Sequence, residues 1–258
     1  MAEWQRDLTG RVLVLVAHPD DESVAYGALL QKMREPVVVI ATDGAPRDEY
    51  FWARFGSREA YRELRRRETH QAMDVAGVRQ LVLLADEDPC LEDQRLFLNL
   101  DAAYRLLEPL IRRLQPEAIA TLAYEGGHPD HDSCGLLAWR LGKDFSIPVW
   151  ETPIYSRESV NGESRLRVQQ FIVQTGNESA VAISEEEYQR KVAICAEYKS
   201  QGDFLPTFNL RSEVVRPQMK YDYSRVPHSG PTNYEQWQWW MSAREVCRKF
   251  ADFVEAGP

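Results

Sequence analysis

Two short apolar runs near the amino terminus constrain the fold of this 258-residue chain more than any other feature of its sequence. They are RVLVLVA at residues 11–17 and VVVIAT at residues 37–42. Unbroken apolar runs of this length are typical of strands that are covered on both faces, as in a parallel sheet. The sequence between them fits a helix from about Ser23 to Met33, so this part of the chain predicts a βαβ unit.

The alternation of strand and helix patterns continues to about residue 150. The next expected elements are a helix over 59–76 that ends at Gly77, a strand over 81–84, a helix over 100–114, a strand over 118–123 and the start of a strand at Val149-Trp150. Repeated βαβ units with right-handed crossovers predict a Rossmann-like, doubly wound α/β fold with a mostly parallel sheet. In the strand order 3-2-1-4-5, strands 1 and 4 are neighbours, so the segments that follow them should converge.

The pattern weakens after residue 150. It suggests strands over 168–173 and 180–183, a helix over 185–198 with a capping box from Ser184 to Glu187, a long loop over 201–233 and a final helix over about 234–254. We therefore expect a single domain, with a Rossmann-like core over about 10–155 and a smaller α+β extension over about 156–258. The final helix would contain Trp237, Trp239 and Trp240, for which packing is a simpler explanation than stacking on a sugar ring.

Charge and composition limit the partners of the chain. The formal net charge is −9, and the run Arg65-Arg66-Arg67 is offset by Glu63 and Glu68, so it is interpreted as a solvated helix face. A nucleic-acid partner is not expected, because phosphate binding needs clustered cations. No window approaches the roughly 18 apolar residues of a membrane span, and the start MAEWQRDLTGR has no signal core, so a cytoplasmic protein is expected. The sequence leaves assembly into a homo-oligomer open.

Two histidine-containing clusters follow the strands that are expected to be neighbours. AHPDDE occupies residues 17–22 after the first strand, and HPDHD occupies residues 128–132 after the fourth. Acidic residues at a helix start are common, because they meet the positive end of the helix dipole. A helix cap has no need for imidazole, however, and a second His-Pro-Asp at the matching strand end favours a functional site.

The donor types in these clusters suit a transition-metal ion. His18, Asp21 and His131 would supply two imidazoles and one carboxylate, which leaves room for water and substrate on the ion. Zinc is the preferred ion, and the same three ligands also accept Fe²⁺. This arrangement favours hydrolysis, with Asp20 as general base, His128 stabilising the oxyanion or protonating the departing amine, and Asp130 orienting His128. The four cysteines are widely spaced without a CxxC motif, so they indicate neither a disulfide framework nor a thiolate zinc site.

Over about residues 10–200, the chain resembles the PIG-L, or LmbE-like, family of zinc-dependent N-acetylglucosaminyl deacetylases. The specific matches are residues 17–22 and 128–131, and softer ones are Thr42-Asp43-Gly44, the helix around Arg67-Glu68 and residues 198–201. The resemblance implies a Rossmann-like fold, release of acetate from an acylated amino-sugar conjugate, and the same ligands, base and electrostatic partner. Some relatives that act on thiol-linked sugar conjugates carry a tyrosine two residues before the second motif. Here that position is Gly126, and Tyr124 lies four residues before it.

Three further residues are candidates for substrate contacts. Asp43 ends the second strand, Arg47 lies in the loop that follows, and Glu68 falls on the apolar stripe of the long helix. Each also has a structural interpretation: Asp43 as a turn residue, Arg47 as an exposed loop side chain, and Glu68 as a buried carboxylate paired with a guanidinium.

Three other functions are compatible with parts of the pattern. A nucleotide-binding oxidoreductase would need G-x-G-x-x-G after the first strand, where this chain has three acids that would repel phosphate. A non-haem iron(II) oxygenase uses the same two-histidine, one-carboxylate ligand set and is the main alternative. A sugar-binding module without catalysis would not need the general base Asp20.

Overall fold

A seven-stranded sheet forms the centre of the computed structural model, which describes residues 3–160 and 163–256. The strands lie in the order β3-β2-β1-β4-β5-β9-β8, and the first five are parallel. Strand β9 is antiparallel to β5, and β8 is antiparallel to β9. Their bounds are β1 Arg11–Val16, β2 Glu35–Ile40, β3 Gln80–Leu83, β4 Ala118–Leu122, β5 Val149–Thr152, β8 Ser179–Ala180 and β9 Val214–Pro217. The expected order 3-2-1-4-5 and the α/β class are confirmed.

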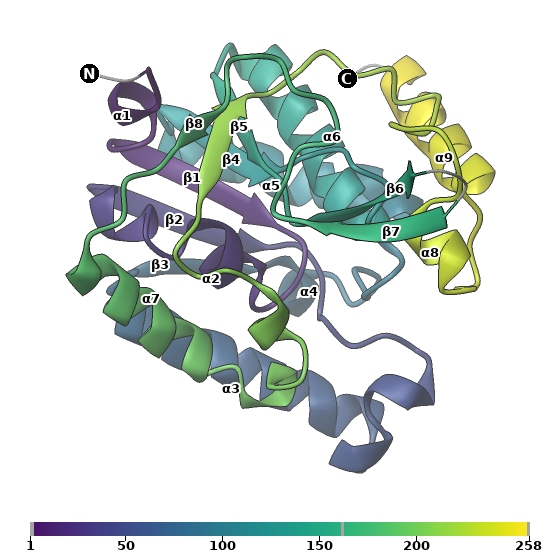
Figure 1. Ribbon diagram of the computed structural model, residues 1–258, viewed down its shortest axis with the longest axis horizontal. Coiled ribbons are helices and arrows are strands. Elements are labelled where there is room, and N and C mark those ends of the chain that lie inside the picture. The colour runs from purple at the N-terminus through teal and green to yellow at the C-terminus, as the bar shows by residue number, and fades with distance from the viewer. Residues whose placement is uncertain (1–2, 161–162, 257–258) are drawn as a thin grey trace.

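Helices cover both faces of the sheet, which explains the unbroken apolar strands (Figure 1). One face carries α2 (Asp21–Tyr26), α3 (Arg58–Ala76) and α7 (Glu185–Ala196), and the other carries α5 (Leu100–Leu114) and α6 (Pro129–Phe145). Helix α9 (Ala243–Glu255) packs beside α6. Every residue of β4 and all of β1 after Arg11 are buried between these layers. Within the described ranges, no helix combines the length and the apolar character needed to cross a membrane.

Shorter elements lie around this framework. The short helices are α1 Glu3–Asp7, α4 Leu84–Glu87 and α8 Asn233–Gln236, and an antiparallel hairpin joins β6 Tyr155–Val160 to β7 Glu163–Val168. Single 3-10 turns occur at Leu30–Lys32, Glu49–Phe51, Ala53–Phe55, Leu96–Leu98, Lys199–Gln201 and Leu205–Thr207. The hairpin and α8 lie on the side of the molecule toward which the parallel strands point (Figure 1).

The local signals at helix ends are confirmed. Gly77 ends α3 in the left-handed conformation, with φ 75° and ψ 18°. Ser184 and Glu187 form the expected capping box at the start of α7. These features depend on neighbouring residues alone, which is why the sequence was sufficient to predict them.

The helix expected over 23–33 is shorter than predicted. Helix α2 ends at Tyr26, and the backbone N–H groups of Ala28 and Leu29 donate to the Glu213 carboxylate at 2.7 and 2.9 Å. The Lys191 ammonium donates to the same carboxylate at 2.7 Å, and both side chains of this ion pair are fully buried. A buried carboxylate from another part of the chain therefore replaces the helical hydrogen bonds.

The predictions for the carboxy-terminal third were less accurate. The strand expected over 168–173 is wrong, because β7 already ends at Val168, and the strand expected over 180–183 shrinks to the two residues of β8. The expected loop over 201–233 contains β9, which was missed because Pro217, a residue rare inside sheets, ends it. Strand β9 pairs with β5, so this segment extends the central sheet.

The expected final helix is interrupted. Helix α8 ends after Gln236, and Gln238 adopts a positive φ of 56°. The Trp239 N–H closes the turn onto the Tyr234 carbonyl at 2.9 Å, and α9 begins only at Ala243. The three tryptophans therefore lie in or beside an irregular connection, and their interpretation as one face of an amphipathic helix is wrong.

Candidate metal centre

The two histidine-containing clusters meet because β1 and β4 are hydrogen-bonded neighbours. His18, Asp20 and Asp21 follow β1, while His128, Asp130 and His131 follow β4, and all six side chains are buried. Pro129 occupies the first turn of α6, where its missing N–H costs nothing. The convergence expected at the carboxyl ends of strands 1 and 4 is present.

The donor groups of His18, Asp21 and His131 form a nearly equilateral triangle, in which each imidazole faces a different oxygen of the Asp21 carboxylate. His18 Nδ1 lies 3.2 Å from His131 Nε2 and 3.3 Å from Asp21 Oδ2, and His131 Nε2 lies 3.2 Å from Asp21 Oδ1. Zinc binds nitrogen and oxygen at about 2.0–2.2 Å, so two ligands of a tetrahedral ion are separated by about 3.3–3.6 Å. The spacing of the three side chains fits an ion of this size.

Other donor atoms lie close to this triangle. The ring nitrogens of His18, His128 and His131 can be grouped within 4.8 Å, as can donor atoms of His18, Asp93, His128 and Asp130. The second group uses His18 Nε2, which already contacts Asp130 Oδ2 at 3.2 Å. The triangle with Asp21 uses His18 Nδ1 and leaves His18 Nε2 to Asp130, so we regard it as the better metal-binding arrangement.

Asp130 orients His18. Its carboxylate accepts the backbone N–H groups of Gln94 at 2.6 Å and Leu96 at 3.0 Å, which fixes its position. A proton on His18 Nε2 would be donated to Asp130 and would leave the lone pair on Nδ1, the atom that faces Asp21 and His131. Outer carboxylates of this kind commonly set the tautomer of a metal-binding histidine.

The expectation that Asp130 orients His128 needs correction. Asp130 Oδ2 is 3.9 Å from His128 Nδ1, and that nitrogen accepts the backbone N–H of Asp130 at 3.1 Å. The proton of neutral His128 must then reside on Nε2. Burial and the nearby His18 lower the pKa of His128, although Asp93 and Asp130 act in the opposite direction.

Asp93 is a site residue that sequence reasoning missed. Its Oδ1 lies 3.3 Å from His18 Nε2 and 3.4 Å from His128 Nε2. Burial alone would raise the pKa of Asp93, but the two imidazoles outweigh it and hold the pKa well below its usual range. In turn, burial alone would lower the pKa of His18, but the carboxylates of Asp93, Asp130 and Asp21 raise it well above its ordinary value. This acidic surrounding favours a positive charge in the centre.

Asp20 and Arg65 form the second part of the site. Asp20 has an unusual backbone, with φ 111°, and its Oδ2 lies 3.5 Å from Arg65 Nη2. Burial raises the pKa of Asp20 to about 8 against the pull of Arg65, while Asp21 and Glu22 add to the rise. Strained backbone at a non-glycine residue is typical of functional sites, where it directs a side chain. Here the strained residue lines the pocket.

Arg65 corrects the interpretation of the arginine run. It is buried, whereas Arg67 is exposed, and its guanidinium donates to the Pro19 carbonyl and to the Tyr61 hydroxyl. The Arg65 Nε–H has no hydrogen-bond partner in the part of the chain that the structure describes. Arg65 also lines the pocket, although its Nε atom is itself buried. In the sequence, the only indication of this burial is the spacing of four residues, which places Arg65 on the same helix face as Tyr61.

The three candidate substrate contacts lie in different places. Asp43 accepts the backbone N–H groups of Ala45 and Asp93, both at 3.0 Å, so it positions the Asp93 loop and does not line the pocket. Arg47 does line the pocket, but it is largely exposed and donates to Glu92 at 2.7 Å. Glu68 is buried and accepts the N–H and hydroxyl of Ser200 at 2.8 and 2.6 Å. The partner of Glu68 is therefore Ser200 and not the expected guanidinium.

Replacing Glu68 by alanine is expected to destabilise the protein without changing KM. The buried Ser200 N–H would lose its acceptor, which typically costs about 1–3 kcal/mol. Urea unfolding of Glu68→Ala beside Arg67→Ala measures this, because the exposed neighbour should change the unfolding free energy by less than about 0.5 kcal/mol. A raised KM with unchanged stability would instead make Glu68 a substrate contact.

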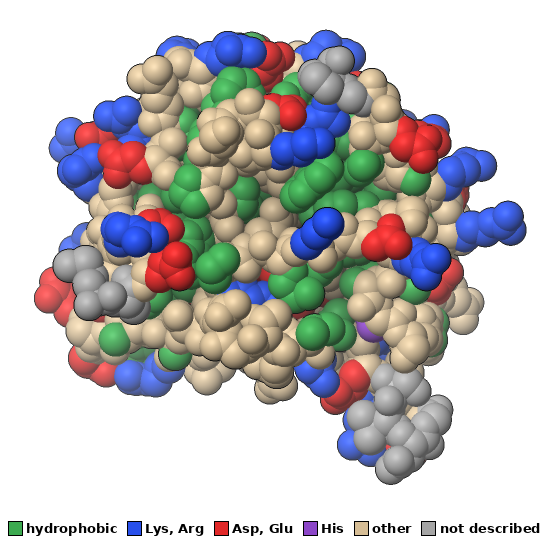
Figure 2. Space-filling view, turned by 90° about the horizontal axis from the view of Figure 1, so that it is seen from above, with side chains coloured by type: hydrophobic (Ala, Val, Ile, Leu, Met, Phe, Trp, Pro, Cys, Tyr) green, Lys and Arg blue, Asp and Glu red, His purple; other side chains and the backbone are tan. Residues whose placement is uncertain are grey.

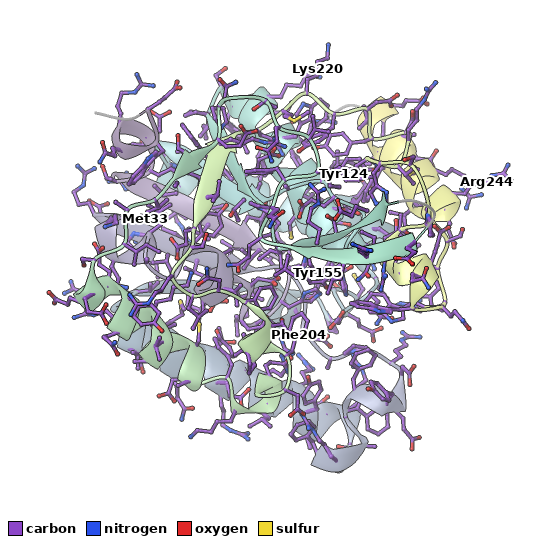
Figure 3. All side chains as sticks on the ribbon, in the orientation of Figure 1. Met33, Tyr124, Tyr155, Phe204, Lys220 and Arg244 are labelled. Carbon is purple, nitrogen blue, oxygen red and sulfur yellow. The ribbon has the colours of Figure 1, made fainter. Side chains whose placement is uncertain are left out.

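A large pocket of about 1370 Å³ opens above these residues. Tyr155 lines it, with its ring 5.3 Å from that of His131 and 5.9 Å from that of Phe204 (Figure 3). A Cβ atom at Gly127 would collide with the Tyr155 carbonyl oxygen, so only glycine lets β6 approach the second cluster this closely. Tyr124, by contrast, donates its hydroxyl to the Arg225 carbonyl at 2.7 Å and does not line the pocket.

Comparison with known proteins agrees with the geometry. The family model of PIG-L, described as GlcNAc-PI de-N-acetylase, matches residues 13–141, which make up half of the chain and contain both clusters. The chain belongs to the PIG-L family. Probable N-acetyl-α-D-glucosaminyl L-malate deacetylases 2 of Bacillus cereus and Bacillus subtilis are 29% and 31% identical to this PIG-L protein, and each alignment covers 59% of it and 72% of the relative.

Solved structures share the fold of this PIG-L protein. A deacetylase of an antimicrobial pseudoaglycone is 20% identical and superposes with a TM-score of 0.62 over 83% of this chain and 99% of the other. N,N'-diacetylchitobiose deacetylase from Pyrococcus horikoshii, also 20% identical, has a TM-score of 0.55 over 80% of this chain and 76% of the other. At these low sequence identities, the structural similarity shows only that the fold is shared.

Proposed function

We propose that this PIG-L protein is a zinc-dependent deacetylase that hydrolyses the N-acetyl amide of an N-acetylglucosamine-type substrate, with His18, Asp21 and His131 holding the ion. The observation that carries the proposal is the triangle of two imidazoles and one carboxylate, whose nearest donor atoms are 3.2–3.3 Å apart, inside the region that the family model matches. The Bacillus relatives, by their names, remove acetyl groups from a glucosaminyl conjugate.

Zinc in such a site lowers the pKa of a bound water to about 7 and polarises a carbonyl, both of which favour attack on an amide. Asp20 accepts the proton of the attacking water, because it lines the pocket next to a ligand without belonging to the triangle. The C–N bond of the amide then breaks, and the proton passes to the departing amine. The products are acetate and a free primary amine.

His128 stabilises the charge that develops on the carbonyl oxygen. Its Nδ1 accepts the Asp130 N–H, so its Nε2–H is the donor that it can present. Asp93 Oδ1 lies 3.4 Å from the same nitrogen but makes no hydrogen bond among the described residues, so this N–H remains free for the carbonyl oxygen. Preorganised donors of this kind typically contribute about 10²–10³ in rate. Asp130 and Asp43 act as positioning residues, on His18 and on the Asp93 loop respectively.

The alternative of a non-haem iron(II) oxygenase is not favoured. Membership of the PIG-L family supports deacetylation, and oxygen activation gives no role to Asp20 beside the ligands. The oxidoreductase alternative fails on the acids at residues 20–22, which are buried where a pyrophosphate would have to lie.

The proposed function is tested by incubating the zinc-loaded protein with a panel of N-acetylglucosamine glycosides. New primary amine and acetate should appear in equal amounts, and an Asp20→Ala variant should release neither at a comparable rate. Absence of both products across the panel, with zinc bound, would exclude the proposed reaction for this substrate class.

A further inference from the structure

The pocket is larger than an N-acetylated sugar requires. Its volume of about 1370 Å³ exceeds the range of about 300–1,000 Å³ that is typical of sites for drug-sized ligands. His18, Asp20 and His131 line it at one end, where the acetamide must lie for the proposed reaction. A single amino-sugar ring placed there would fill only part of the pocket. The remaining volume is free for another part of the substrate.

Aromatic side chains make up much of the rest of the lining. They come from three separate segments and are Tyr50, Phe51, Phe204, Trp237, Trp239 and Trp240. Trp239 lies nearest the catalytic residues, with its ring 4.9 Å from that of His128. Four of these aromatic side chains are well exposed, namely Tyr50 at 85%, Phe204 at 37%, Trp237 at 40% and Trp240 at 50%. In the described part of the chain only Leu166, Val173 and Val226 are other large apolar side chains with such exposure, and none of the three lines the pocket. Exposed aromatic groups gathered at one opening indicate a binding surface.

Two of these rings are held in place by their neighbours. Trp240 stacks on Phe97 at 5.6 Å, and the Arg95 guanidinium lies 5.0 Å from its ring centre. Trp237 lies 5.3 Å from Trp239, and the Arg157 guanidinium is 5.9 Å from its ring. Because these contacts fix the rings before a ligand arrives, little conformational entropy is lost on binding.

Three arginines at this opening already have acidic partners, two of them sharing Glu92. Arg47 pairs with Glu92 at 2.7 Å, Arg54 with Asp203 at 2.7 Å, and Arg95 with Glu92 at 3.6 Å. The upper face of the molecule, which Figure 2 shows, also carries charged side chains of both signs without a block of one sign. An anionic group, such as the malate that the names of the Bacillus relatives contain, would have to displace these acids. An uncharged aromatic group would not.

We propose that the outer part of the pocket is a subsite for an uncharged aromatic aglycone attached to the N-acetylated amino sugar. This inference rests on the proposed deacetylation and names its substrate class. Trp237 and Trp240 provide the stacking surfaces, with Tyr50 and Phe204 completing the opening. The aglycone stays outside the catalytic centre and contributes binding energy that positions the acetamide.

The test compares kcat/KM for matched phenyl, methyl and carboxymethyl glycosides of N-acetylglucosamine, as both anomers. The phenyl glycoside should exceed the methyl one by about tenfold, the equivalent of one to two aromatic contacts. The carboxymethyl glycoside should gain nothing over the methyl one. Equal rates for phenyl and methyl, or a preference for the carboxylate, would overturn the aromatic subsite.

Variants locate the effect. Trp240→Ala and Trp237→Ala should bring the phenyl-to-methyl ratio of kcat/KM close to one, whereas Trp240→Phe should largely retain it. Leu166→Ala is the control, because Leu166 is exposed on β7 and does not line the pocket, so this variant should leave the ratio unchanged. A ratio that survives both alanine substitutions would contradict the assignment. Circular dichroism and thermal unfolding confirm that each variant is folded.

Calorimetry separates failure of this inference from failure of the proposed function. If no glycoside is deacetylated, the Kd values of the phenyl and methyl glycosides for the zinc-loaded protein still report on the subsite. Tighter binding of the phenyl glycoside that is lost in Trp240→Ala would retain the subsite and remove the reaction. Equal Kd values would remove the subsite itself.

Discussion

Replacing Asp20 by asparagine is expected to lower kcat by about 10²–10⁴, the usual contribution of a general base. The amide keeps the shape of the side chain but cannot accept the proton of the attacking water. Asp20 is not part of the ligand triangle, so the zinc content of the variant should remain that of the parent protein. Steady-state kinetics and elemental analysis of the same preparations measure the two quantities.

The matched control is Asp86→Asn, the same chemical change in a partly exposed carboxylate that pairs with Arg66 at 3.0 Å. This variant should keep both kcat and zinc content. The proposed role of Asp20 would be wrong if Asp20→Asn retained kcat within about threefold, or if its loss of activity followed a loss of zinc. In the second case Asp20 would belong to the ligands.

Removal of the metal should abolish activity, and readdition of zinc should restore it. Chelation empties the site, while His131→Ala removes one of three ligands from it. Removing a residue that only hydrogen-bonds to a metal ligand typically lowers the metal affinity by about 10–100-fold. Removing the ligand itself should therefore lower the zinc affinity by at least about 100-fold. Competition with a zinc indicator measures the affinity, and elemental analysis should find about one ion per chain before treatment.

The exposed His70 on α3 provides the comparison, because His70→Ala leaves the triangle intact. Full activity in the chelated protein would exclude a catalytic ion. Restoration by iron(II) but not by zinc would keep the three ligands and change the identity of the metal.

The sequence was most informative where neighbouring residues determine the structure. Strands β1, β2 and β4 were recognisable because both of their faces are covered, and the ends of α3 and α7 because their caps are local. The early end of α2 could not be predicted, because it depends on Glu213, which accepts the Ala28 N–H and lies 185 residues away in the chain. Strand β9 was concealed for a similar reason, because its partners β5 and β8 are distant in sequence.

The same distinction applies to the candidate site. His18, Asp21 and His131 lie in two compact motifs, and the strand order was enough to bring them together. Asp93 and Arg65 come from segments without a motif, and only the folded chain places them beside Asp20, His18 and His128. The tryptophans at the opening were misinterpreted because a helical pattern does not reveal the break at Gln238.

The part of the chain that builds the central sheet is longer than the part that the family model matches. The PIG-L match ends at residue 141, within α6, but β5 needs β9 along its outer edge, and Glu213 accepts two backbone N–H groups just after α2. We propose that the chain folds as one cooperative unit. A fragment of residues 1–155 would expose an unpaired strand to other molecules and leave those two donors without an acceptor, so it should aggregate on expression while the full chain stays monodisperse in light scattering.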